Sequence, residues 1–137
     1  MVKDIRMRSA TKQEGVVALK KARQFAETAN EAFEYERWDS AGLNAIHSGI
    51  SAADAVLICA SGQRCASADH AHVSDALARQ VRSYMGSPKT QLLGLLKMKN
   101  VVAYEQRLIT RSEANRLVMA ADRFLAWAED CCSASSR

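Results

Sequence analysis

The sequence predicts an all-α fold, an up-and-down antiparallel bundle in which four helices enclose the core and a fifth packs alongside. The 137 residues are 48% hydrophobic and 25% charged, which suits one compact domain. Alanine is the commonest residue and there is a single proline, a composition that favours helices over sheet. Apolar residues also recur at helical spacing in five segments, with no strand pattern. We expect the domain to span 11–130, with flexible ends at 1–10 and 131–137.

The first two predicted helices have clear end signals. The first covers about 11–36 and opens with "TKQE", a capping box in which Thr11 caps the helix and Glu14 reaches back. Small alanines line its apolar face; they would let another helix approach closely, or the face could be an interface with another molecule. The second begins near Asp39 or Ser40 and ends at Gly62, a typical C-cap. Its apolar positions are Leu43, Ile46, Ile50, Ala53 and Leu57.

Three further helices follow. The third starts around Ser67 to Asp69, ends at Gly86, and turns four apolar residues inward: Val73, Leu77, Val81 and Tyr84. The fourth covers about 87–104 and opens with "SPKT", with Ser87 as cap and Pro88 at the first helical position. The fifth opens with "TRSE", a second capping box, formed by Thr110 and Glu113.

Charge and cysteine content narrow the functional classes. The net charge of +4 is compatible with a nucleic-acid or nucleotide partner but does not demand one. We found no run of about 18 apolar residues and no signal peptide, so we expect a cytoplasmic protein with no membrane segment. The four cysteines lack the spacing of a zinc site, even with His70 and His72 considered. We therefore expect reduced thiols, no metal site and no cofactor.

A lysine interrupts the apolar face of the fourth helix. On a helical wheel, Lys99 falls in the middle of an arc formed by Leu92, Leu95, Leu96, Val102 and Ala103. A lysine there must extend to solvent, meet a carboxylate or lose its proton. Asn100 and Tyr104 lie on the neighbouring flank, near Lys97.

Other helices offer partners for Lys99. On the second helix, Asp54 and His47 lie two turns apart and border the apolar positions, with Asn44 on the polar side. On the third helix, His70 shares a face with the inward residues. Asp54, His70, Lys99 and Tyr104 would converge if the three helices pack as neighbours. The alternative for Lys99 and Asp54 is a buried structural ion pair.

These residues also carry a family resemblance. The segment "LLKMKNVVAYEQR" resembles the fourth-helix signature of HEPN domains, small helical bundles found beside nucleotidyltransferases and in RNA-cleaving toxins. "ISAADA", "DHAHVSDAL" and "ANRLVMAADRFLAWAE" extend the likeness over about 11–130. RNase-active members carry an arginine, a polar residue after it and a histidine four to six positions further on. The matching positions here are Lys99, Asn100 and Tyr104, and tyrosine is a poor general base at neutral pH.

The resemblance implies a HEPN-like module that binds a nucleotide, RNA or a partner protein through a polar cleft between helices, without strong catalysis. It implies a homodimer with two fourth helices across a shared cleft, and a nucleotidyltransferase or antitoxin as partner. The candidate reactive residues are Lys99, Asn100, Tyr104 and His70; the candidate ligand contacts are Asp54, His47, Asn44 and Lys97. One alternative is a metal-independent endoribonuclease in which Lys99 stabilises phosphate charge. Another is a structural interaction protein with no small ligand.

Overall fold

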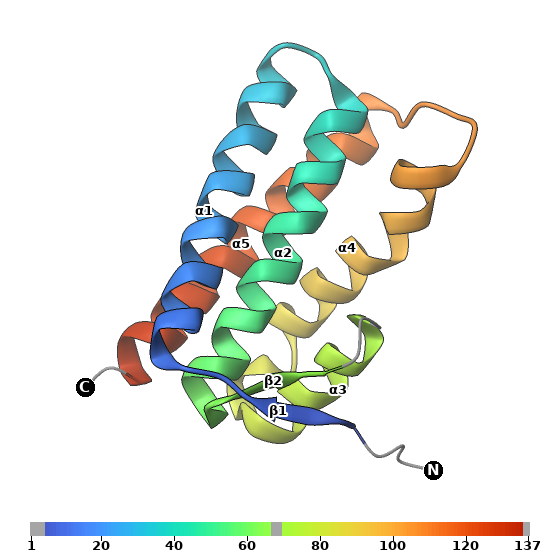
Figure 1. Cartoon of the computed structure of the whole chain (residues 1–137). Coiled ribbons are helices and arrows are strands. Elements are labelled where there is room, and N and C mark those ends of the chain that lie inside the picture. Colours follow the sequence, from blue (N-terminus) through green and yellow to red (C-terminus); the bar gives the residue numbers. More distant parts are fainter. Residues whose placement is uncertain (1–4, 67–69, 136–137) are drawn as a thin grey trace.

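A computed structural model describes residues 5–66 and 70–135 and confirms the all-α class. Four long helices run in alternating directions, and a short helix, α3, lies at one end of them (Figure 1). The first strand and the end of the last helix lie at that same end (Figure 1). In chain order the elements are β1 (Met7–Ser9), α1 (Lys12–Glu34), α2 (Trp38–Ser61), β2 (Gln63–Cys65), α3 (His70–Gln80), the 3-10 turn η1 (Arg82–Tyr84), α4 (Ser87–Tyr104) and α5 (Arg111–Ser135).

Two capping boxes and one C-cap form as the sequence predicts. At the start of α1, the Glu14 N–H donates to Thr11 Oγ1 at 3.1 Å and the Thr11 N–H donates to Glu14 Oε2 at 3.3 Å. At the start of α5, the Glu113 N–H donates to Thr110 Oγ1 at 3.1 Å and the Thr110 N–H to Glu113 Oε1 at 2.9 Å. Gly62 ends α2 with a left-handed φ of 67°. These local features mark the starts of α1 and α5 and the end of α2.

α2 is the central helix and contacts α1, α3, α4 and α5. The alanine face of α1 packs within the bundle: Ala22, Ala26, Ala29 and Ala32 are all buried. The Ser48 hydroxyl on α2 donates to the Ala22 carbonyl at 2.8 Å, a contact that requires the two helices to lie very close. The alternative role of this face, as an interface with another molecule, is therefore wrong.

Glycines and alanines also let α4 approach α2. A Cβ added at Gly49 would lie 2.6 Å from Leu95 Cδ1, so any larger residue there would force the fully buried Leu95 side chain to shift. Leu92 and Leu95 fill the space between these helices and are fully buried. The missing side chain at Gly49 therefore leaves the space on α2 into which Leu95 of α4 packs.

The third predicted helix is divided in two. α3 ends at Gln80, Val81 takes an extended conformation with φ −132° and ψ 105°, and η1 follows. Tyr84 is fully buried, as predicted, and its hydroxyl lies 2.6 Å from that of Ser74. The predicted start at Ser67 to Asp69 lies outside the described residues. Gly86, and not Ser87, is the N-cap of α4, while Pro88 lies in its first turn as predicted.

The chain ends differ from the sequence prediction. β1 pairs antiparallel with β2, with Met7 opposite Cys65, and Ile5 and Met7 pack against the core. A strand of three residues is too short to show an alternating pattern, so periodicity missed it. At the other end α5 continues to Ser135 and buries Cys132, within the segment predicted to be a flexible tail.

α2 is the one helix among the described residues that is long and apolar enough to cross a membrane. More than half of its most apolar window is buried inside the bundle. The central helix of a helical bundle has this composition because its neighbours cover it on several sides. The apolar character of α2 is therefore explained by its place in the fold.

Candidate functional site

The structure places Asp54 beside a cation other than Lys99. Asp54 lines a groove between α1 and α2, near Lys21 and Arg64. Burial raises the pKa of the Asp54 carboxyl, and the charge of Arg64 on β2 partly offsets that rise. No ion pair joins Asp54 to Lys99 in the described parts of the chain. The electrostatic partner of Asp54 is thus supplied by the short strand that sequence periodicity missed.

Two of the three predicted residues at the end of α4 face solvent. Lys99 is half-buried, as its wheel position implies, but Asn100 is exposed and Tyr104 is 72% exposed. Tyr104 is the last residue of α4, and α4 ends at the end of the bundle opposite the β-strands (Figure 1). Asp54 lies in the later half of α2, which runs towards the strands, and His70 is the first residue of α3 at that same end. Tyr104 therefore does not share a cleft with Asp54 or His70.

The remaining predicted residues have local packing roles. The Asn44 side chain donates to the Ser40 carbonyl at 2.9 Å, one turn earlier on α2. The His47 ring packs against Phe25 of α1 with 5.6 Å between centroids. His70 points inward, as predicted, against apolar residues of α2 and α4 that include Ile50 and Leu96.

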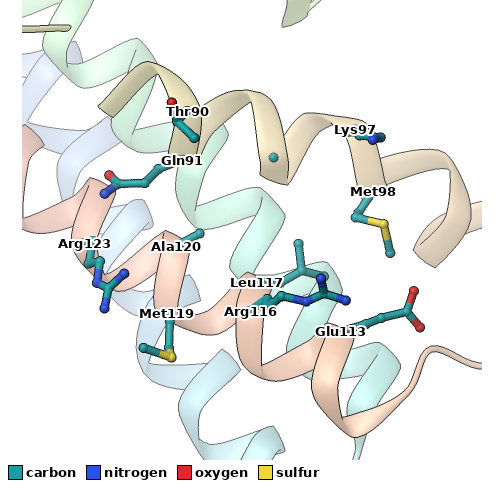
Figure 2. A pocket seen from close by; sticks show the side chains of 11 residues that line it. Thr90, Gln91, Lys97, Met98, Glu113, Arg116, Leu117, Met119, Ala120 and Arg123 are labelled. Atoms are coloured by element: carbon teal, nitrogen blue, oxygen red, sulfur yellow. The ribbon is translucent and has the colours of Figure 1, made fainter. Parts of the chain in front are cut away.

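A different site lies between α4 and α5. We call it the α4–α5 groove; its volume is about 490 Å³, within the range of small-molecule pockets. Figure 2 shows side chains of both helices facing this space. α4 contributes Thr90, Gln91, Gly94, Lys97 and Met98, and α5 contributes Glu113, Arg116, Leu117, Met119, Ala120 and Arg123. Lys97 is the one predicted site residue that lines it.

The α4–α5 groove is basic at its edges and apolar at its floor. Lys97, Arg116 and Arg123 bring three cations to its rim (Figure 2). Met98, Leu117 and Ala120 supply apolar atoms between them, and Met119, which is 42% exposed, adds a thioether facing solvent. Such a combination favours a ligand that carries negative charge at one part and a flat or apolar group at another.

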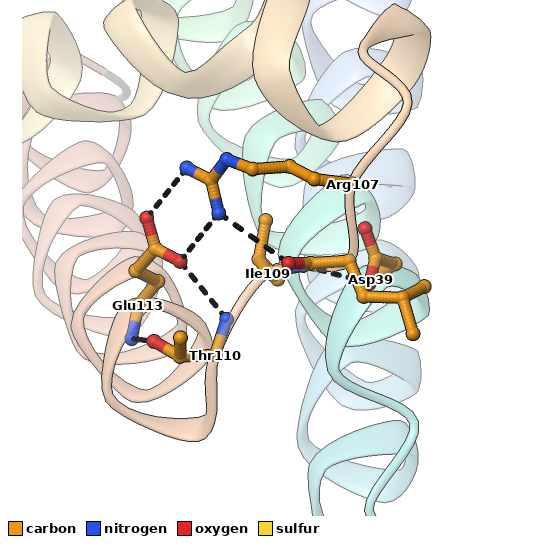
Figure 3. Close-up of polar contacts among 6 residues, drawn as sticks. Asp39, Arg107, Ile109, Thr110 and Glu113 are labelled. Carbon is orange, nitrogen blue, oxygen red and sulfur yellow. Dashed lines mark hydrogen bonds and ion pairs between the residues drawn. The ribbon is translucent and has the colours of Figure 1, made fainter.

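The carboxylate of the groove is already engaged. Arg107 donates to both oxygens of Glu113 at 3.0 Å (Figure 3). The hydrogen bond from Arg107, followed by that from the Thr110 backbone, lowers the pKa of Glu113 to about 2. Because its charge is compensated by Arg107, Glu113 does not neutralise the three cations at the rim.

Gln91 and Gly94 give the groove a free hydrogen-bond acceptor and open space for a ligand. The Gln91 Oε1 atom is buried and accepts no hydrogen bond within the described structure. A Cβ added at Gly94 would meet no atom within 4 Å, so the backbone of α4 is open to the groove there. A buried acceptor with no donor is uncommon in proteins, and a ligand donor would satisfy it.

Sequence reasoning missed most of this site, although a signal was present. Arg116 and Arg123 are seven residues apart and therefore lie two turns apart on one face of α5. Gly94 follows Leu92 and Leu93 within the apolar part of α4, where an alanine or leucine is more usual.

Comparison with known proteins adds no assignment: the chain matches no protein-family model and no curated protein.

Proposed function

We propose that this chain is a HEPN-like binding module that holds a nucleoside phosphate, free or as part of RNA, in the α4–α5 groove without strong catalysis. The observation that carries the proposal is the set of three cations, Lys97, Arg116 and Arg123, around an apolar floor. The basic net charge of +4 is consistent with an anionic ligand.

The phosphate and the base of a nucleoside phosphate each have a counterpart in the groove. Arg116 and Arg123 provide guanidinium groups that can bind phosphate oxygens in pairs, and Lys97 adds a point charge. The thioethers of Met98 and Met119 are polarisable and can pack against a base. The buried Gln91 Oε1 would accept a hydrogen bond from an amino or imino group of that base.

The groove lacks the groups that catalysis would use. No histidine or cysteine is among its described lining residues, and the carboxylate of Glu113 is held by Arg107. Efficient proton transfer requires a base with a pKa near neutral pH, and the pKa of Glu113 is about 2. The geometry therefore favours binding over cleavage.

Fluorescence anisotropy would test the proposal, with dye-labelled ATP and a dye-labelled single-stranded RNA as probes. We expect Arg116→Ala and Arg123→Ala each to weaken binding about 10- to 100-fold, because each removes a charge-assisted contact. Lys20→Ala, at an exposed position of α1, is the matched control and should bind normally. For RNA, the log of the affinity should fall with the log of salt concentration with a slope of about −2. Equal affinity in the two arginine variants and the control would refute the proposal.

A steric variant distinguishes binding in the α4–α5 groove from binding at the C-terminal end of α4. Gly94→Leu places a side chain in the open part of the groove and should abolish binding while circular dichroism shows an intact fold. Lys99→Ala should leave binding unchanged. Loss of binding in Lys99→Ala with normal binding in Gly94→Leu would place the site at Lys99, Asn100 and Tyr104 instead.

A further inference from the structure

Two cysteines that are 73 positions apart in the sequence meet between α2 and α5. The Cys59 thiol donates to Cys132 Sγ, with 2.7 Å between the sulfur atoms. The Cys132 thiol in turn lies 3.7 Å from the Ala55 carbonyl. Both residues are in regular helix, next to the buried Ile58 and one turn after the buried Ala128, so the packing of the two helices holds the sulfurs together.

We propose that Cys59 and Cys132 are an oxidative modification site, at which a reversible disulfide cross-links the end of α2 to the end of α5. The inference is independent of the α4–α5 groove and of its ligand. The sulfur atoms need to approach by roughly 0.6 Å to reach bonding distance, a shift that side-chain rotation can supply. Proximity set by the fold is the main condition that a disulfide requires.

The other two cysteines have different neighbours. Cys65 is buried on β2, with its sulfur 3.9 Å from that of Met7. Cys131 lies 3.9 Å from the Ser83 hydroxyl of η1. The structure therefore favours Cys132 over its neighbour Cys131 as the partner of Cys59.

The two sulfurs have distinct roles in the reaction. Cys59 is half-buried and the more accessible of the pair, whereas burial and then the adjacent Cys59 raise the pKa of Cys132. A peroxide therefore reacts first at Cys59: the sulfur gains an oxygen to become a sulfenic acid, the O–O bond breaks and one water leaves. Cys132 sulfur then attacks Cys59 sulfur, the S–O bond breaks, and the Cys132 proton leaves with the hydroxyl as a second water. Two thiols are oxidised and one hydrogen peroxide is reduced.

Mass spectrometry of the full chain would test the cross-link. The protein is treated with hydrogen peroxide, alkylated with N-ethylmaleimide and digested with trypsin without reductant. We expect peptide 38–64 joined to peptide 124–137, with the loss of two hydrogen masses and no dimer, and full reversal by dithiothreitol. Only intermolecular dimers, or sulfinic acid at Cys59 with no cross-link, would overturn the proposal.

Matched variants identify the partner, because Cys131 and Cys132 fall on the same tryptic peptide. Cys59→Ser and Cys132→Ala should abolish the cross-link, and Cys131→Ser should retain it. Oxidation should raise the melting temperature by about 5–15 °C in the wild type and in Cys131→Ser, and not in the other two variants. A cross-link that persists in Cys132→Ala would contradict the assignment. Cys59→Ser, at a half-buried position, keeps the test valid should Cys132→Ala fail to fold.

Discussion

Glu113 performs two tasks at the connection between α4 and α5. Its carboxylate closes the capping box with Thr110 and accepts two hydrogen bonds from Arg107 (Figure 3). The adjacent Ile109 N–H donates to Asp39 at 3.1 Å, which ties the same connection to the start of α2. One carboxylate thus orients the start of α5 and pairs with Arg107, which compensates the negative charge that Glu113 brings to the α4–α5 groove.

Glu113→Gln should lower the melting temperature by a few degrees at pH 7, because it removes the charged partner of Arg107 and weakens the cap. The folded-state pKa of Glu113, about 2, is below its ordinary value of 4.5. The stabilisation is therefore complete above pH 4.5 and is lost as the pH falls towards 2. Thermal melts followed by circular dichroism should show the two proteins converging over that range. Glu31→Gln, an exposed carboxylate on α1, is the control and should melt like the wild type at pH 7.

Asp54 has the opposite pH dependence, because its pKa is raised mainly by burial. As the pH rises above 3.8 the unfolded chain loses its proton first, so the folded state becomes less stable. Asp54→Asn should therefore raise the melting temperature by a few degrees at pH 7 and leave it nearly unchanged at pH 3. The same substitution at the exposed Asp75 of α3 should show no such gain. A lower melting temperature for Asp54→Asn at pH 7 would mean that the electrostatic attraction to Arg64 outweighs the cost of burial.

Alanine substitutions at two helical glycines should change the stability of the protein in opposite directions. Gly49→Ala should destabilise the protein by about 1–3 kcal/mol, since its Cβ would lie 2.6 Å from the side chain of the fully buried Leu95. Gly94→Ala meets no atom within 4 Å and should stabilise α4 by about 0.5–1 kcal/mol. Urea denaturation of the two variants measures both effects. A gain from Gly49→Ala would show that α2 and α4 can separate at little cost.

Helix boundaries were predictable where the signal was local. The two capping boxes and Gly62 depend on residues within one turn, so the sequence alone identifies them. The break at Val81 and the strand β1 depend on contacts with distant residues. Tyr84 reaches the core only because η1 turns it beneath α3, and β1 forms only because β2 lies beside it.

The candidate site was less predictable for a geometric reason. A helical wheel gives the direction of a side chain around the helix axis, and for Lys99 that direction was informative. It does not give the position of the residue along the bundle. The helical wheels of α2 and α4 allow Asp54 and Tyr104 to face each other. The two residues nevertheless lie towards opposite ends of the bundle, because α2 and α4 run antiparallel (Figure 1) and both residues are in the later half of their helix.

At the scale of the whole molecule, the homodimer implied by the HEPN resemblance stays a prediction. Leu93 is 43% exposed on α4, the helix expected to face its copy. Sedimentation or light scattering should give about twice the 15.0 kDa chain mass, and Leu93→Asp should give the monomer. Lys20→Ala is the control for the general effect of a surface change. A wild-type mass equal to that of one chain would contradict the predicted homodimer.

Strand β1 and the last turns of α5 lie at one end of the bundle, and the turn between α1 and α2 lies at the other (Figure 1). A peptide linker joining 135 to 5, with the chain reopened at 35–37, would leave all five helices uncut. We therefore expect a circularly permuted version to reach the same packing. The order in which the helices are synthesised would then change while their arrangement would not.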